Sequence, residues 1–179
     1  MAESSFLNPA QAVAAAGIDE GMKVAELGAS SGFFTRASAR HAGQGGVVWA
    51  VDSSAEALSR IKNISAAEGL HNVEVVRGNI EHLGGTNLPE ATFDYCIVAN
   101  ALFGVECKSC LAGEAARILK RGGRVLLIDW TGSHGGLGPH PRQVTGRSDA
   151  LPIFEREGFS VVSDIPAGAY HWGCILKKK

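Results

Sequence analysis

The chain has 179 residues, of which 45% are hydrophobic and 20% are charged, and its net charge at pH 7 is −1. This length and composition are those of a single globular domain over residues 1–179, with enough apolar side chains for a substantial core. A charge so close to neutral gives no support to nucleic acid or an anionic membrane as a partner held by bulk electrostatics. The first residues lack the basic and apolar regions of a secretion signal, and no apolar run is long enough to span a bilayer. The sequence therefore predicts a cytoplasmic domain with no membrane span.

Apolar runs alternate with helical patterns along the chain, which is typical of βαβ units around a mainly parallel sheet. In chain order the pattern predicts a helix over Pro9–Ala16, a strand over Lys23–Leu27, a helix over Phe33–His41, a strand over Val47–Val51, a helix that opens at Ser53, strands over Val73–Val76 and Phe93–Ala99, a helix over Lys108–Leu119 and a strand over Arg124–Asp129. Ser53 and Glu56 fit a capping box. The segment Lys120–Gly123 combines cations with glycines, which usually end a helix.

The last part of the chain departs from the βαβ pattern. Thr131–Arg147 is rich in glycine, proline and histidine and is predicted to be a long loop, followed by a helix over Ser148–Glu157. Strands are then predicted over Phe159–Ser163 and Tyr170–Leu176. Their connection is too short for a parallel crossover, so this pair is predicted to be antiparallel.

The segment Glu26–Gly32 joins a predicted strand to a predicted helix through small residues. Small residues let a ligand approach the backbone, and a helix N-terminus offers free N–H groups. Asp52 ends the next strand, where an open α/β sheet places an acid that binds ribose hydroxyls. A dinucleotide fingerprint requires G-x-G-x-x-G, but Ser30 and Phe33 occupy its second and third glycine positions, which disfavours a nicotinamide dinucleotide. The acidic Glu26 suits a ligand with an ammonium group better than one with a pyrophosphate.

These segments resemble the motifs of the class I S-adenosylmethionine-dependent methyltransferases and occur in the family's order. The similar segments are Glu26–Gly32, Val48–Ser53, Val75–Leu83, Phe93–Leu102 and Glu114–Trp130, and Gly168–Gly173 resembles the ending of the ubiquinone/menaquinone-biosynthesis-type subgroup. Ser30, Asn79 and Arg121 depart from the residues that are usual in these motifs. The resemblance implies a Rossmann-like three-layer α/β/α sandwich. Its seven-stranded, mostly parallel sheet would have the order 3-2-1-4-5-7-6 and an antiparallel last strand.

The resemblance also implies which residues bind S-adenosylmethionine. Glu26, Gly28, Ala29 and Gly32 would line its methionine part, Asp52 would bind the ribose hydroxyls with Ser53 beside the adenine, Asn79 and Ile80 would flank the adenine, and Asn100 and Ala101 would face the methionine part and the substrate.

The activity implied is methyl transfer to an unidentified small-molecule acceptor, with S-adenosylhomocysteine as the product. The sulfonium is already activated, so the protein must align the reactants and exclude water, and it needs a base only if the acceptor loses a proton. The alternative is a catalytically silent cofactor-binding subunit, because the chain is short for this family and has only a modest N-terminal helix to cover the site. The acceptor atom and a homodimer stay open.

Three histidines are candidates for a catalytic base. His134 and His140 lie in the predicted loop after the fifth strand, which lies over the carboxyl ends of the strands, where ligands bind in such sheets. The alternative is that both are polar loop residues. His171, in the last hairpin, would either face the same cleft or support it.

The four cysteines are predicted to be reduced thiols, because the sequence gives no secretory context. Cys96 and Cys174 have the pattern of strand-core residues. Cys107-Lys-Ser-Cys110 begins a predicted helix, where thiolates are favoured, and this leaves a redox role open beside that of incidental thiols. Two cysteines supply only half of a structural zinc site, so no metal site is predicted. Because arsenite methyltransferases also use several cysteines, a metalloid acceptor stays open.

Overall fold

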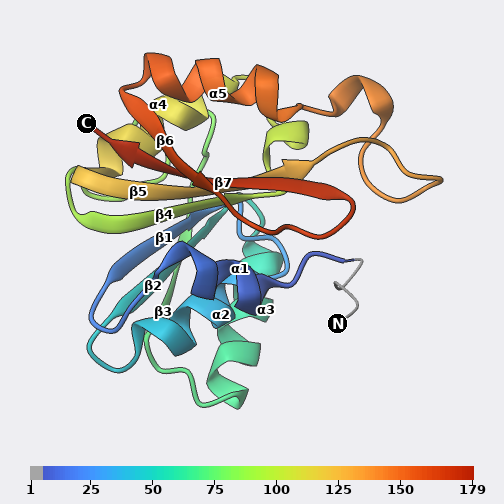
Figure 1. Cartoon of the computed structure of the whole chain (residues 1–179). Coiled ribbons are helices and arrows are strands. Elements are labelled where there is room, and N and C mark those ends of the chain that lie inside the picture. The colour runs from blue at the N-terminus through green and yellow to red at the C-terminus, as the bar shows by residue number, and fades with distance from the viewer. Residues whose placement is uncertain (1–5) are drawn as a thin grey trace.

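The computed structural model describes residues 6–179, which form a central sheet covered by helices on both faces (Figure 1). The sheet has seven strands in the order β3-β2-β1-β4-β5-β7-β6. The strands are β1 (Lys23–Leu27), β2 (Val47–Asp52), β3 (Val73–Arg77), β4 (Phe93–Ala99), β5 (Leu119–Trp130), β6 (Phe159–Asp164) and β7 (His171–Lys178). The helices are α1 (Pro9–Ala16), α2 (Phe33–Ala42), α3 (Ala55–Ala67), α4 (Lys108–Ile118) and α5 (Arg147–Arg156), with 3₁₀ turns η1 (Leu102–Gly104) and η2 (Pro141–Gln143). The predicted Rossmann-like fold and strand order are confirmed.

Each face of the sheet has its own apolar core. Helices α1, α2 and α3 cover one face, and α4 and α5 cover the other (Figure 1). Alternate residues of the central strands point to opposite faces, so in β1 Val24 packs in the first core while Ala25 and Leu27 pack in the second. Helix α3 buries Ala57, Leu58, Ile61 and Ser65, whereas Ile64 is only half-buried.

The strands β1 to β5 are parallel, and β7 is antiparallel to both β5 and β6, as predicted. Because β7 runs in the opposite direction, its first residue, His171, pairs with Trp130 at the end of β5. The start of β7 therefore lies at the same edge of the sheet as the carboxyl ends of β1, β4 and β5. This edge is where ligands bind in open α/β sheets.

Two predicted boundaries are wrong, and the other predicted ends differ from the structure by at most two residues. Helix α3 is capped by Ser54 and not by Ser53, because the Ser54 hydroxyl accepts the N–H of Ala57 at 3.2 Å. Helix α4 ends at Ile118, and the Lys120–Gly123 segment that was predicted to end it forms the first part of β5. A bulge between β4 and β5 and the positive φ of 78° at Gly122 accommodate these residues in the sheet.

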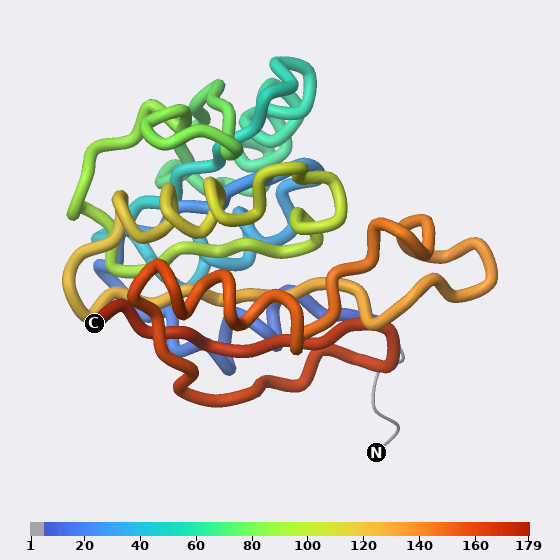
Figure 2. Tube along the Cα trace, turned by 90° about the horizontal axis from the view of Figure 1, so that it is seen from above, coloured from blue at the N-terminus to red at the C-terminus, as the bar shows by residue number. Residues whose placement is uncertain are grey.

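Residues 131–146, drawn in orange, project beyond the sheet at the edge where β5 ends and β7 begins (Figures 1 and 2). As predicted, this segment is mainly loop, although it contains η2 and a bridge between His134 and Leu137. Within residues 6–179, no helix combines the length and apolar character that a membrane crossing requires.

Candidate functional site

Two adjoining cavities lie at the carboxyl ends of the parallel strands. The larger cavity has a volume of about 530 Å³ and is lined by Phe6, Leu7, Pro9, Glu26, Gly28, Ala29, Ser30, Ser31, Phe33, Phe34, Ala99, Asn100, Phe103, Trp130 and His171. The smaller cavity, of about 170 Å³, is lined by Gly28, Asp52, Ser53, Gly78, Asn79, Ile80, Glu81, Gly104 and Val105. Because Gly28 lines both cavities, one elongated ligand can extend from one into the other across this residue.

The loop between β1 and α2 needs glycine at two positions. Gly28 has a φ of +81°, and a Cβ there would lie 3.3 Å from the Cβ of Ala101 and 3.4 Å from the Cδ1 of Ile80. Gly32 caps α2 with a φ of +72°, and a Cβ there would lie only 2.7 Å from the Cγ1 of Ile61. Both positions disfavour any side chain, so the backbone at Gly28 stays open to a ligand.

Glu26 is a buried carboxyl group in the wall of the larger cavity. Its position near the end of β1 places it beside α2, from which the hydroxyl of Thr35 donates a hydrogen bond to its Oε2. Burial raises the pKa of Glu26 to about 8, and the hydrogen bond from Thr35 opposes this shift. A cationic group in the cavity would offset the cost of burying the carboxylate.

Asp52 connects the glycine loop to the end of β2. Its Oδ2 accepts the N–H of Ser30 at 2.9 Å, and its Oδ1 accepts the N–H of Ser54 at 2.9 Å. A carboxylate has about four lone-pair sites. Asp52, which lines the smaller cavity, therefore retains capacity to accept hydrogen bonds from two hydroxyl groups of a ligand.

The side chain of Arg36 stabilises the loop between β1 and α2. Its Nη1 donates to the carbonyl oxygens of Ser31 at 3.2 Å and Gly32 at 3.1 Å, and its Nε lies 3.2 Å from a carboxylate oxygen of Glu68. Its guanidinium also lies 5.0 Å from the centre of the Phe33 ring, which lines the larger cavity. These contacts hold the carbonyl groups of the loop and the Phe33 ring in place.

The far wall of the larger cavity carries two polar side chains without partners. Among residues 6–179, the Oδ1 of Asn100 and both ring nitrogens of His171 are buried and accept or donate no hydrogen bond. Asn100 follows β4 with a φ of 54°, and His171 is 8% exposed and stacks on Trp130 with ring centres 4.2 Å apart. Burial lowers the pKa of His171, and the nearby His134 lowers it further, so its ring is neutral near pH 7. Buried polar atoms without partners are rare and suit a bound ligand.

Comparison with known proteins identifies the family. Residues 18–151 match the model of the methyltransferase domain family. The chain belongs to this methyltransferase family. The match confirms the resemblance to S-adenosylmethionine-dependent methyltransferases that the motifs predict.

Individual methyltransferases agree with this assignment. The chain is 28% identical to the ubiquinone/menaquinone biosynthesis C-methyltransferase UbiE of Pectobacterium carotovorum over 159 residues, which cover 87% of this chain and 59% of that protein. It is 30% identical to the UbiE of Pasteurella multocida over 119 residues, which cover 64% of this chain and 42% of that protein. The matched part spans about half the length of these curated relatives. A SAM-dependent methyltransferase from Aquifex aeolicus has the same fold, with a TM-score of 0.88 and 24% identity over 98% of this chain and 92% of that one.

Polar groups around the two cavities of this methyltransferase domain are chemically complementary to two parts of S-adenosylmethionine. The methionine part of this cofactor carries an ammonium group, which matches the buried carboxyl group of Glu26 in the larger cavity. Its ribose carries two hydroxyls, which match the free acceptor capacity of Asp52 in the smaller cavity. The open backbone at Gly28 lies between these two residues.

Most of the cofactor residues that the resemblance implies lie around the two cavities. Glu26, Ala29 and Asn100 line the larger cavity, Asp52, Ser53, Asn79 and Ile80 line the smaller one, and Gly28 lines both. Gly32 and Ala101 line neither cavity. Gly32 packs against Ile61, and the side chain of Ala101 packs against Gly28.

The structure separates the three candidate histidines. His171 lines the larger cavity, whereas His134 and His140 line neither of the two cavities described above. His134 stacks on Tyr170 with ring centres 5.0 Å apart, and His140 is exposed and caps η2 through its Nδ1. The motifs did not identify Phe6, Leu7, Phe103 or Trp130 as lining residues, because these come from distant segments that meet only in the folded chain.

The prediction that all four cysteines are reduced is wrong in this structure. Cys107 and Cys110 form a disulfide at the start of α4, whereas Cys96 and Cys174 are free and buried, as their strand pattern predicted. The prediction rested on cellular compartment, and the short spacing in the helix is what allows the bond. In the described part of the chain, no three His, Cys, Asp or Glu side chains are grouped to hold a metal ion.

Proposed function

We propose that this chain transfers the methyl group of S-adenosylmethionine to a small acceptor molecule in the larger cavity. The observation that carries the proposal is the pair of cavities joined at Gly28, with a buried carboxyl group in one and Asp52 in the other. Glu26 and Ala29 would hold the methionine part, and Asp52 would hold the ribose. When bound, the cofactor supplies a methyl group that is already activated by its sulfonium.

The adenine end would occupy the smaller cavity. Asn79 and Ile80 line one side of it, and Ser53 lies beside Asp52 at the end of β2. The side-chain Oδ1 of Asn79 accepts the N–H of Glu81 at 2.8 Å, so its amide nitrogen is left to donate to a ring acceptor. The apolar side chain of Ile80 offers a surface against which a planar base packs.

The remaining wall of the larger cavity indicates the class of acceptor. Phe6, Phe33, Phe103 and Trp130 give it an aromatic lining, which suits a planar and largely apolar molecule. The curated relatives are named as C-methyltransferases of ubiquinone/menaquinone biosynthesis, and this favours a carbon atom as the acceptor. An acceptor carbon that gains a methyl group must lose a proton. The neutral His171 has free ring nitrogens with which to take that proton.

Calorimetry with S-adenosylmethionine and S-adenosylhomocysteine tests the cofactor part of the proposal. Both should bind, and Asp52→Ala should weaken binding at least tenfold, because two ribose hydroxyls lose their acceptor. Asp19→Ala, a change at an exposed aspartate outside both cavities, is the matched control and should bind like the wild type. Affinity unchanged by Asp52→Ala would remove this residue from the site.

Methyl transfer from labelled S-adenosylmethionine to a panel of phenolic and quinol-type acceptors tests the acceptor part. His171→Gln should lower kcat by about 10²–10⁴-fold and leave cofactor affinity unchanged. The pH dependence of kcat/KM attributable to the imidazole should also disappear. Cofactor binding without transfer to any acceptor of the panel would instead favour a catalytically silent subunit.

A further inference from the structure

The Cys107–Cys110 pair lies outside the cavities, yet it is connected to the smaller one. Cys107 caps α4, and its Sγ accepts the N–H of Cys110 at 3.3 Å. Both cysteines are partly exposed, and Ser109 between them is exposed. A thiol from solvent can therefore approach the disulfide, unlike the buried Cys96.

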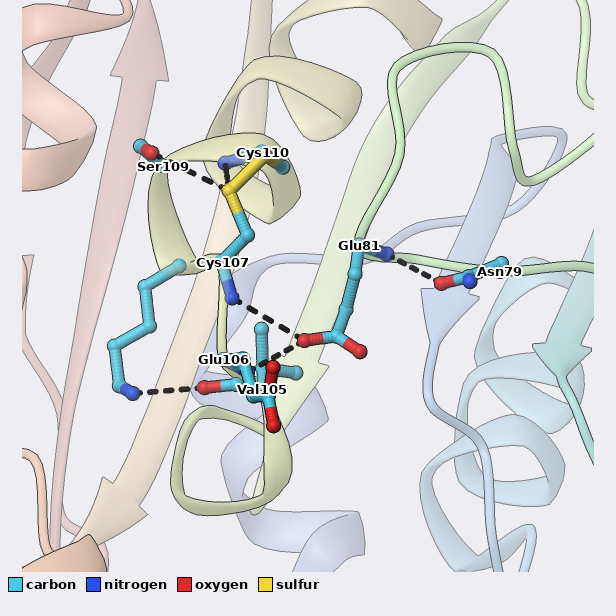
Figure 3. The surroundings of a disulfide bond; sticks show 8 residues. Asn79, Glu81, Val105, Glu106, Cys107, Ser109 and Cys110 are labelled. Atoms are coloured by element: carbon cyan, nitrogen blue, oxygen red, sulfur yellow. Dashed lines mark hydrogen bonds between the residues drawn. A yellow bond between two sulfur atoms is a disulfide. The ribbon is translucent and has the colours of Figure 1, made fainter.

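Glu81 lies between Cys107 of the disulfide and Asn79, and it is hydrogen-bonded to both (Figure 3). Its Oε1 accepts the N–H groups of Glu106 and Cys107, the latter at 3.2 Å. Its own N–H donates to the side chain of Asn79 at 2.8 Å. Glu81 also lines the smaller cavity, as does Val105, two residues before Cys107. The carboxylate of Glu81 therefore binds the start of α4, and the same residue lines the smaller cavity, where the adenine is proposed to lie.

We propose that Cys107 and Cys110 are a thiol–disulfide exchange site for an external dithiol, and that their redox state changes cofactor binding through Glu81. A thiolate of the dithiol attacks one sulfur of the disulfide, and a mixed disulfide forms as the Cys107–Cys110 bond breaks. The second thiol of the dithiol then resolves the mixed disulfide. Two electrons pass to the cysteine pair, each cysteine sulfur ends with one proton or as a thiolate, and the dithiol leaves as a disulfide.

Charge explains why reduction should reach the cavity. The N-terminus of α4 favours the thiolate of a reduced cysteine, which also lies beside Lys108. A thiolate at Cys107 would lie next to the carboxylate of Glu81, which accepts the N–H of that same residue. The Sγ of Cys107 accepts the N–H of Cys110, and Glu81 accepts the N–H of Cys107, so two anions then lie close together at the start of α4 and their repulsion displaces the carboxylate. Displacement of Glu81 disturbs the wall formed with Asn79 and Val105, so the reduced protein should bind the cofactor more weakly.

The exchange itself is tested without any cofactor. The oxidised protein is treated with dithiothreitol at defined ratios to its oxidised form and then alkylated under native conditions, and the labelled peptides are identified by mass spectrometry. Reduction should label Cys107 and Cys110 together, while the buried Cys96 and Cys174 stay unlabelled. A pair that stays unlabelled in excess dithiothreitol would overturn the proposal.

The second part rests on the proposed function and is measured by calorimetry with S-adenosylhomocysteine. The affinity of the reduced wild type should be at least threefold lower than that of the oxidised protein. Coupling is reciprocal, so saturation with S-adenosylhomocysteine should shift the dithiothreitol equilibrium toward the disulfide by the same factor. Glu81→Gln should abolish both differences, and Glu106→Gln, which changes the neighbouring exposed carboxylate, should retain them.

The outcomes separate the two proposals. Equal affinity in both redox states, or a difference that persists in Glu81→Gln, would overturn the coupling through Glu81. Absence of cofactor binding in both states, with normal labelling of Cys107 and Cys110, would refute the proposed function and leave the exchange site standing. The comparison of oxidised and reduced wild type needs no substitution, so it does not depend on the folding of a variant.

Discussion

Glu26 is a carboxyl group whose charge depends on what occupies the larger cavity. Burial raises its pKa to about 8, so it is largely protonated at pH 7 in the ligand-free protein. An ammonium group beside it would favour the carboxylate and lower the pKa again. The binding of a ligand with such a group is therefore coupled to the release of a proton.

We expect the affinity for S-adenosylmethionine to rise between pH 6 and pH 8, by at most tenfold per pH unit, because one proton is released. Calorimetry in buffers of different ionisation enthalpy measures that proton directly. Glu26→Gln should bind more weakly and lose this pH dependence. A proton release that persists in Glu26→Gln would assign it to another group.

The protonation of Glu26 also affects folding stability, and here a rise in pH is unfavourable, whereas it favours cofactor binding. The folded-state pKa of about 8 lies above the ordinary value of 4.5, so the protonated form favours the folded state. This contribution is fully present below pH 4.5 and is lost as the pH rises through 8. Without a ligand, the difference in unfolding free energy between wild type and Glu26→Gln should therefore change across this range.

At the scale of secondary structure, α4 is joined to the segment before β4 by a buried ionic network. Glu114 is fully buried and accepts the N–H groups of Gly84 at 2.6 Å and Thr86 at 3.2 Å, together with the hydroxyl of Thr86. Arg117 donates to both of its carboxylate oxygens, at 2.7 and 2.8 Å, and to the carbonyl oxygen of Leu88 at 2.7 Å. The family motif that includes Glu114 and Arg117 therefore has a structural role in this chain.

Glu114→Gln should lower the free energy of unfolding by about 3–5 kcal/mol, because it leaves Arg117 and the surrounding donors without their buried anion. Urea denaturation measures the loss, and Glu74→Gln, at an exposed position on β3, should stay within about 0.5 kcal/mol of the wild type. Burial alone would raise the pKa of Glu114, but the hydrogen bonds from Arg117, Thr86 and Gly84 together outweigh it and lower the pKa to about 2. The wild type should therefore lose this stability as the pH falls from 4.5 toward 2, and the variant should not.

Sequence patterns predicted elements better than they predicted boundaries. The antiparallel pairing of β7 could be predicted because the link after Asp164 is too short for a crossover. The choice of Ser54 over Ser53 as a cap could not, because adjacent serines have the same chemistry. In the folded chain Asp52 accepts the N–H of Ser54, and the Ser54 hydroxyl accepts the N–H of Ala57. In the same way, Lys120–Gly123 has the composition of a helix end, yet it lies within β5 because the flanking residues Leu119 and Arg124 both pair with β4.

Prediction of the site succeeded where consecutive residues build it and failed where distant segments meet. The glycine loop and Asp52 lie in local motifs, whereas Trp130 and Phe6 reach the larger cavity only through the packing of the folded chain.

For the whole molecule, the last strand lies inside the sheet and not at its edge. Strand β7 is paired with β5 on one side and β6 on the other, and its Trp172, Cys174 and Leu176 are buried. A chain that ends before β7 would leave the edge of β5 unpaired and part of one core exposed.

Removal of residues 168–179 should therefore prevent cooperative folding, whereas removal of Lys179 alone should lower the melting temperature by only a few degrees. Circular dichroism during heating distinguishes the two results. A truncated chain that melts cooperatively near the wild-type temperature would show that the remaining strands form a stable sheet without β7.

The pairing of Trp130 with His171 has a further consequence for how the protein could diverge. These two residues belong to the antiparallel part of the sheet, whereas Glu26, Gly28 and Asp52 belong to the first βαβ unit. On the proposed function, substitutions around the two aromatic rings would select among acceptors while the methyl donor is retained. Natural selection, or a designer who recombines segments of related enzymes, could then exchange acceptor preference as a module.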